Sequence, residues 1–201
     1  MAKNPLVFIC FFLLSLTSTI VESKSTSSSS FIKASCKVTQ YPTLCERTLS
    51  PYTATVKQNP RELAQTALRV GLSRAQTAKR LATKLTKSKG LKGNEYINNV
   101  LKDCSGQMSD SMDRIKQSRL ELKLMASKVL TTQEYLWSIS NVQTWVSAAL
   151  TDQTSCLDGL SDWVVLNRGA VLKAQIMNRI VDAQQTTSNA LALINQLAVK
   201  P

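Results

Sequence analysis

The chain has 201 residues, a formal net charge of +12 at pH 7, 5 cysteines and no histidine. The absence of histidine excludes catalysis by a serine–histidine or cysteine–histidine pair, and it removes the commonest metal ligand. The length suffices for one domain with its own hydrophobic core. The positive charge either solubilises the surface or attracts an acidic partner.

The N-terminus has the features of a secretory signal peptide. Lys3 precedes an apolar run at residues 6–16, and residues 21–23 resemble a small-residue cleavage site. The run is too short to span a bilayer, which takes about 20 apolar residues. We therefore predict a signal peptide over residues 1–23, a secreted chain with no membrane segment after cleavage, and no nucleic-acid partner. Residues 24–30 are rich in serine and are expected to be flexible.

We expect one domain over residues 31–201, of which residues 31–58 form an appendage to the rest. This appendage contains Cys36 and Cys45, with Pro42 between them. Proline disfavours helix at the residue before it. The appendage should therefore bend into two short helices, a hairpin closed by its own disulfide.

Residues 59–201 contain four long segments with the 3.6-residue period of an α-helix. The first begins at Asn59, a good N-cap, with Pro60 at the first helical position. The third begins at Thr131, with Glu134 in the spacing of a capping box, and stops around Gly159. The predicted core positions are Ala64, Leu68, Gly71, Ala75, Ala78, Ala82 and Leu85, then Ile97, Leu101, Cys104, Met108, Met112, Ile115 and Leu122, then Val142, Trp145, Ala149 and Cys156, and finally Leu172, Ile176, Ile180, Ala183, Thr187, Ala190, Ile194 and Leu197.

The links between these segments are short, at roughly 88–93, 126–131 and 159–168. Short links make consecutive helices antiparallel neighbours. The predicted fold is therefore all-α, an up-down-up-down four-helix bundle with an N-terminal helical hairpin.

Two disulfides are expected, because four cysteines remain once the leader with Cys10 is removed. Cys104 and Cys156 lie on the core stripes of adjacent helices, which predicts a Cys104–Cys156 bridge beside the Cys36–Cys45 bridge. In the chain-entropy account, the long loop stabilises the fold by about 4 kcal/mol and the short one by about 2.7 kcal/mol.

Enzymatic chemistry is not predicted. Residues 90–93 form a loop between helices rather than a phosphate-binding motif. Asp110 and Asp113 share one helix face, but a bundle surface offers no cleft for the paired-carboxylate chemistry of a glycosidase. We expect no catalytic residue, no metal and no cofactor.

Several segments are similar to a known family. Residues 36–45 (CKVTQYPTLC), 101–104 (LKDC), 145–159 (WVSAALTDQTSCLDG) and 186–193 (TTSNALAL) resemble the plant invertase and pectin methylesterase inhibitors. The resemblance covers residues 31–197 and includes the order and spacing of the four cysteines. It implies a four-helix bundle with an N-terminal hairpin and bridges joining the first cysteine to the second and the third to the fourth.

The resemblance also implies that the chain is an inhibitor in the apoplast or cell wall. Members of the family form a complex, expected to be 1:1, with either pectin methylesterase or acid invertase, and block access to its substrate cleft. Invertase inhibitors resemble one another in a Pro-Lys-Phe motif, where this chain has residues 90–94 (GLKGN). The missing motif favours pectin methylesterase as the target.

By the same resemblance, Asp110, Asp113, Ser155 and Asp158 are the expected contacts with the enzyme. Gly106 stands where an acidic residue is common in the family. Two alternatives remain open: an inhibitor of acid invertase, and a basic wall protein that binds anionic, de-esterified pectin through its positive charge.

Overall fold

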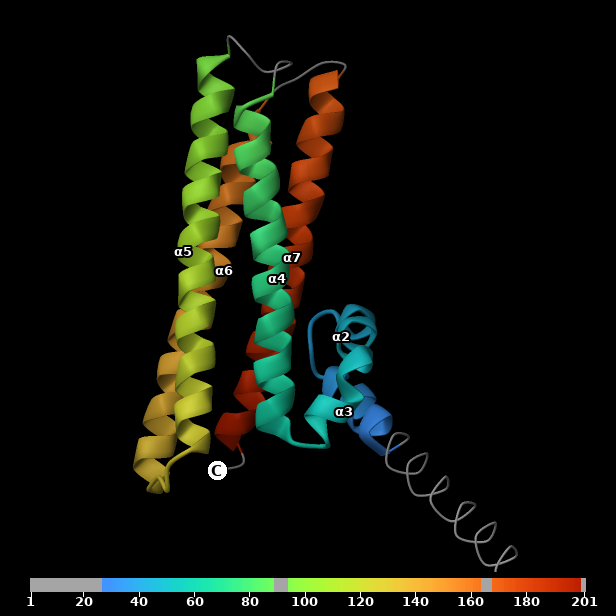
Figure 1. Ribbon diagram of the computed structural model, residues 1–201, viewed down its shortest axis with the longest axis vertical. Coiled ribbons are helices and arrows are strands. Elements are labelled where there is room, and N and C mark those ends of the chain that lie inside the picture. Colours follow the sequence, from blue (N-terminus) through green and yellow to red (C-terminus); the bar gives the residue numbers. More distant parts are fainter. Residues whose placement is uncertain (1–26, 89–93, 164–167, 200–201) are drawn as a thin grey trace, which may run out of the picture.

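The computed structural model describes residues 27–88, 94–163 and 168–199, and its regular elements in these ranges are helical (Figure 1). Residues 27–36 form the first helix. The later elements are α2 (Pro42–Leu49), the 3-10 turn η1 (Ser50–Tyr52), α3 (Thr53–Val56), α4 (Pro60–Thr86), α5 (Glu95–Ala126), α6 (Thr132–Ser161) and α7 (Arg168–Val199). The expected signal peptide, residues 24–26 and the predicted loop at 90–93 lie outside the described residues.

The four long helices form the predicted bundle. α4 packs against α5 and α7, and α6 packs against the same two neighbours, so the helices follow one another around the bundle. Consecutive helices run in opposite directions (Figure 1). The expected all-α, up-down-up-down architecture is therefore confirmed. In the described part of the chain, no helix combines the length and apolar character needed to cross a membrane.

The helices begin where their capping residues predict. The side chain of Asn59 accepts hydrogen bonds from the backbone amides of Arg61 and Glu62, at 2.9 and 3.1 Å. Thr131 and Glu134 form the expected capping box at the start of α6. These side chains accept hydrogen bonds from amides that have no partner within the helix, which fixes the helix starts.

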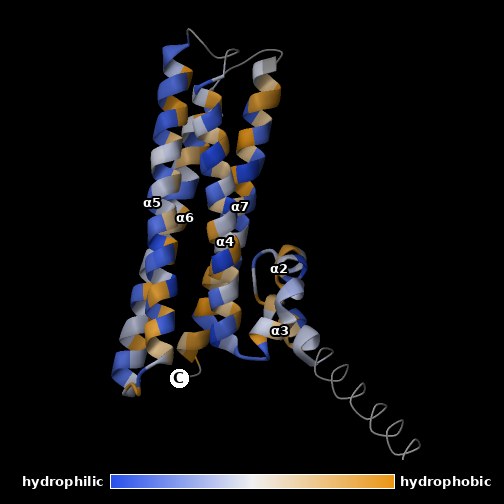
Figure 2. Cartoon of the chain, viewed as in Figure 1, coloured by the Kyte–Doolittle hydropathy of each residue, from blue (hydrophilic) through white to orange (hydrophobic). Residues whose placement is uncertain are grey.

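The core has two apolar halves separated by a buried polar layer. One cluster packs the hairpin with the first half of α4 and with the parts of α5, α6 and α7 at the same end of the bundle, and the other surrounds the Cys104–Cys156 bridge. Figure 2 shows the hydrophobic and hydrophilic residues alternating in bands along the bundle helices. Of the predicted core positions, all are buried except Met112, Trp145 and Leu172, which are half-buried.

The N-terminal hairpin, residues 27–56, packs against α4 and α7 (Figure 1). A buried side chain of α7 holds its bend: Asn189 Oδ1 accepts from the amide of Tyr41, and Asn189 Nδ2 donates to the carbonyl of Tyr41, both at 3.0 Å. The Cys36–Cys45 bridge closes the hairpin, with 5.6 Å between the Cα atoms. This is the pairing that the sequence predicts.

Three expectations from the sequence need correction. Residues 27–30 were expected to be flexible but are helical, because Ser28 continues the i, i+4 stripe of Ile32 and Cys36 and is only 5% exposed. Trp145 was expected in the core, but Val146 occupies that position and is fully buried. Helix α6 also continues past the expected stop at Gly159, to Ser161.

Candidate protein-binding face

Helices α5 and α6 are joined by three cross-links of different chemistry, between residues 104–114 of α5 and residues 152–156 of α6. They are the Cys104–Cys156 disulfide with 4.4 Å between Cα atoms, the hydrogen bond from Gln153 Nε2 to Ser111 Oγ at 2.9 Å, and the ion pair from Arg114 Nε to Asp152 Oδ2 at 2.9 Å. The disulfide pairing is the one expected from the sequence. Together these links fix the register of the two antiparallel helices and make the pair a rigid unit.

The polar layer of the core centres on Gln153, whose side chain is fully buried. Its Nε2 also donates to Thr187 Oγ1 of α7 at 3.1 Å, and Gln153, Ser111 and Thr187 are each fully buried. Thr187 Oγ1 lies 3.1 Å from where a Cβ on Gly71 would stand, so a glycine there lets α4 and α7 approach closely.

Sequence reasoning missed Gln153 and its partner Ser111. The signal was present, because Gln153 lies four residues after Ala149 and three before Cys156, which puts it on the predicted core stripe of α6. A polar residue on such a stripe indicates a buried hydrogen-bond network, since a buried amide without partners is costly.

The four predicted contact residues all lie on the outside of this helix pair. Asp110, Asp113, Ser155 and Asp158 are exposed. The cross-links place Ser155 and Asp158 near the level of the disulfide, Asp110 near the level of Gln153, and Asp113 one turn further along α5. The structure thus distributes them along one helix pair rather than gathering them in a single cluster.

Asp110 and Asp113 differ in their surroundings. Lys116 Nζ donates to Asp113 Oδ1 at 2.7 Å, and this hydrogen bond, followed by the positive charge of Lys116, lowers the pKa of Asp113. In the described ranges, the Asp110 carboxylate has no ion pair or side-chain hydrogen bond. Of the two carboxylates, Asp110 is therefore the one that an external cation can contact without displacing a lysine.

The charges of the bundle are unevenly distributed. The charged side chains of α6 are all acidic: Glu134, Asp152 and Asp158. Those of α4 are mostly basic: Arg61, Glu62, Arg69, Arg74, Lys79, Arg80 and Lys84. Helix α5 carries both signs. The outer surface of these two helices, here called the α5–α6 face, includes Asp110, Asp113, Ser155 and Asp158. It is therefore neutral to acidic in a chain of strongly positive net charge.

Metal binding is a separate question for the α5–α6 pair. The structure places no group of three or more His, Cys, Asp or Glu side chains close enough to hold a metal ion within the ranges that it describes. What the face offers is a long, rigid surface with exposed carboxylates and hydroxyls.

The comparisons with known proteins agree with this architecture. The family described as "Plant invertase/pectin methylesterase inhibitor" matches residues 30–193. The chain is 43% identical over 197 residues to "Pectinesterase inhibitor 9" of Arabidopsis thaliana, covering 94% of each chain. It is 38% identical over 200 residues to a "21 kDa protein" of Daucus carota, covering 100% of this chain and 97% of that protein.

The fold is also that of a solved structure. A crystal structure of a mutant form of a pectin methylesterase inhibitor from Arabidopsis aligns with a TM-score of 0.61 at 18% identity, over 80% of this chain and 92% of that one. This structural likeness establishes the fold, and the sequence matches over nearly the whole described chain establish the relationship. The chain belongs to the plant invertase/pectin methylesterase inhibitor family.

Proposed function

We propose that the protein is a secreted inhibitor of plant pectin methylesterase that acts by binding and catalyses no reaction. The family match across residues 30–193, with relatives named pectinesterase inhibitors, is the observation that carries this proposal. The expected signal peptide and the two disulfides support an extracellular location, the apoplast or cell wall.

The proposed mechanism is occlusion of the enzyme's substrate cleft by the α5–α6 face in a 1:1 complex. A stable protein–protein interface buries about 1,200–2,000 Å² in total. With 32 residues, α5 is about 48 Å long at the rise of an α-helix, so two such helices side by side offer sufficient surface.

Rigidity of the pair supports this mechanism. Ordering flexible groups on binding costs free energy, and a preformed face avoids that cost. The disulfide, the buried Gln153 hydrogen bonds and the Arg114–Asp152 ion pair hold the two helices in one arrangement before the enzyme arrives. Asp110, Asp113, Ser155 and Asp158 are the proposed polar contacts.

The test is a titration of a plant pectin methylesterase with the mature protein. We expect activity to fall linearly to an endpoint at one inhibitor per enzyme. Replacement of Asp110 and Asp113 by alanine should raise the inhibition constant by about tenfold, equivalent to about 1.4 kcal/mol. Glu46→Ala with Glu62→Ala is the matched control, because it removes the same charge from the hairpin and α4.

A gain of binding can be tested at Gly106. This residue is exposed, and a Cβ built on it meets no atom within 4 Å, so Gly106→Asp should not disturb the fold. Since members of the family commonly carry an acidic residue there, the substitution should strengthen inhibition.

The same titration against acid invertase decides between the two possible target enzymes. Inhibition of invertase alone would overturn the proposed target.

A further inference from the structure

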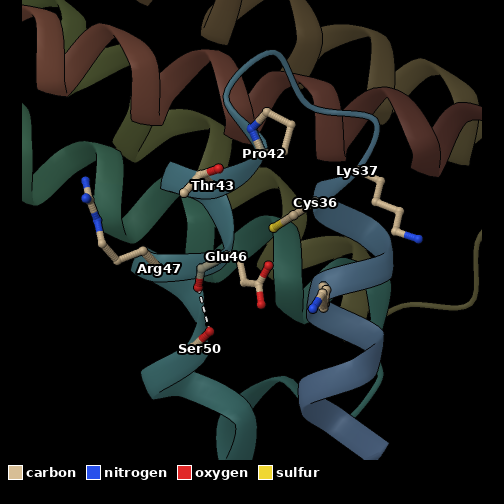
Figure 3. A pocket seen from close by; sticks show the side chains of 8 residues that line it. Cys36, Lys37, Pro42, Thr43, Glu46, Arg47 and Ser50 are labelled. Carbon is tan, nitrogen blue, oxygen red and sulfur yellow. Dashed lines mark hydrogen bonds between the residues drawn. The ribbon is translucent and has the colours of Figure 1, made fainter.

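The hairpin side of the molecule has two adjoining open hollows bordered by basic side chains. The first, of about 470 Å³, is lined by Lys33, Lys37, Glu46 and Arg47 among others (Figure 3). The second, of about 590 Å³, lies between the hairpin and α4 and includes Arg47, Arg69 and Arg74. Arg47 borders both hollows, so the five basic residues form one continuous surface, here called the hairpin cation surface.

The second hollow is the more strongly positive of the two, because no acidic residue lines it. Arg69 lies over the ring of Tyr52, with its guanidinium carbon 4.8 Å from the ring centre, which holds the arginine in place. Arg74 is partly neutralised by Asp182 of α7, at 3.3 Å. Burial, and then the charge of Arg69, lower the pKa of Arg119 of α5.

Most of the surface lacks an internal counter-charge. The ion pairs found among the described residues include none formed by Lys33, Lys37, Arg47 or Arg69. In the first hollow, the carboxylate of Glu46 lies between Lys37 and Arg47, whose side chains extend to either side (Figure 3). Because Arg47 and Arg69 both line the second hollow, which has no acidic residue in its lining, the strongest attraction for an external anion is there.

We propose that the hairpin cation surface binds a chain of uronic acid carboxylates, as in de-esterified pectin. Arginine is suited to this ligand, because its planar guanidinium makes paired hydrogen bonds to a carboxylate. A polymer with a carboxylate on each sugar can contact several separated cations at once, whereas a small anion contacts only one. The choice of a polyuronate over other polyanions rests on the proposed function, since such a polymer is the product of the proposed target enzyme.

The proposed site lies on the hairpin and the first half of α4, away from the α5–α6 face. The inhibitor would then bind wall polymer and enzyme through different surfaces. It would accumulate where ester groups have already been removed, which is where the esterase has acted. Because the attraction is between exposed charges, added salt should weaken it strongly.

The experiment measures binding of the mature protein to polygalacturonate, with no esterase present, so its outcome does not depend on inhibition. Binding is expected to polygalacturonate and not to highly methyl-esterified pectin, which has the same backbone without the charges. Arg47→Gln with Arg69→Gln should lower the affinity about tenfold, equivalent to about 1.4 kcal/mol. Circular dichroism confirms that the variant is folded.

The matched control is Arg80→Gln with Arg179→Gln, two exposed arginines in the other half of the bundle. This pair removes the same charge and should leave the affinity within about twofold of the parent. Lys33→Gln with Lys37→Gln is a second test in case the arginine variant does not fold, with an expected loss of about threefold because Glu46 lies nearby.

Equal losses in the site and control variants would overturn the proposal, because net charge alone would then explain binding. Equal binding to methyl-esterified pectin would also overturn it. Tighter binding of DNA at equal charge concentration, lost in the same arginine variant, would assign the surface to nucleic acid instead.

Discussion

The hairpin side and the α5–α6 face are fastened and charged in different ways. The hairpin is closed by a disulfide between residues 9 positions apart and is attached to α7 by the side chain of Asn189. The α5–α6 face is held by a disulfide between residues 52 positions apart and by buried hydrogen bonds of Gln153. One side is basic and the other neutral to acidic, so the small bundle has two surfaces of different charge that mutations can change separately.

The largest expected difference concerns the two disulfides. Cys156→Ala should lower the free energy of unfolding more than Cys36→Ala, because its bridge closes the longer loop: about 4 kcal/mol against about 2.7 kcal/mol in the chain-entropy account. Chemical denaturation followed by circular dichroism measures both. The variants Cys104→Ala/Cys156→Ala and Cys36→Ala/Cys45→Ala repeat the comparison without a free thiol. Equal losses in the two pairs would contradict the ranking.

The attachment of the hairpin is the next test. Asn189→Ala removes two hydrogen bonds to the backbone of Tyr41 and should cost about 2 kcal/mol, because Asn189 is buried. Hydrogen exchange should become faster in residues 27–56 while α5 and α6 are unchanged. Asn195→Ala is the matched control on the same helix, since Asn195 is exposed and its side-chain oxygen accepts a hydrogen bond from Gln143. Uniformly faster exchange in both regions would show that the hairpin is not a separate unit.

The capping box of α6 gives the smallest expected effect. Thr131→Ala removes a side-chain acceptor for the amide of Glu134 and should cost about 1 kcal/mol near neutral pH. Thr132→Ala, at the next position, which is also exposed, should cost less than about 0.5 kcal/mol.

The same box predicts a pH dependence. Hydrogen bonds from the amide and then the hydroxyl of Thr131 lower the pKa of Glu134 in the folded state. Because the folded-state pKa lies below the unfolded one, this stabilisation is present above the ordinary glutamate pKa and is lost as the pH falls through the lowered value. The free energy of unfolding of Glu134→Gln should therefore be closest to that of the parent at acidic pH. If the difference in unfolding free energy between Glu134→Gln and the parent grew as the pH fell, this prediction would be contradicted.

Much of the fold could be predicted from the sequence because local signals and the core pattern agree. Asn59 and Thr131 predicted the helix starts, and the short links predicted the antiparallel order. The core stripes predicted that Cys104 and Cys156 lie on adjacent helices. The prediction was wrong where composition was given more weight than pattern. Ser28 lies in a serine-rich segment, but its spacing from Ile32 and Cys36 makes it helical and buried.

The proposed sites were less predictable, because they depend on which surfaces meet in three dimensions. Asp110 and Asp113 were identified through a family resemblance, and the sequence alone did not show that Asp113 is paired with Lys116. Arg47 and Arg69 are 22 positions apart in the sequence numbering and border one hollow only because the hairpin folds back onto α4. No periodicity in the sequence indicates that these two arginines border the same hollow.

The most direct test of the account uses both surfaces in both assays. Asp110→Ala/Asp113→Ala should weaken inhibition of pectin methylesterase by about tenfold and leave polygalacturonate binding within about twofold of the parent. Arg47→Gln/Arg69→Gln should do the opposite, with inhibition assayed on a short esterified oligosaccharide that carries no free carboxylate. If each variant impairs both activities equally, the two surfaces are not separate and the account is wrong.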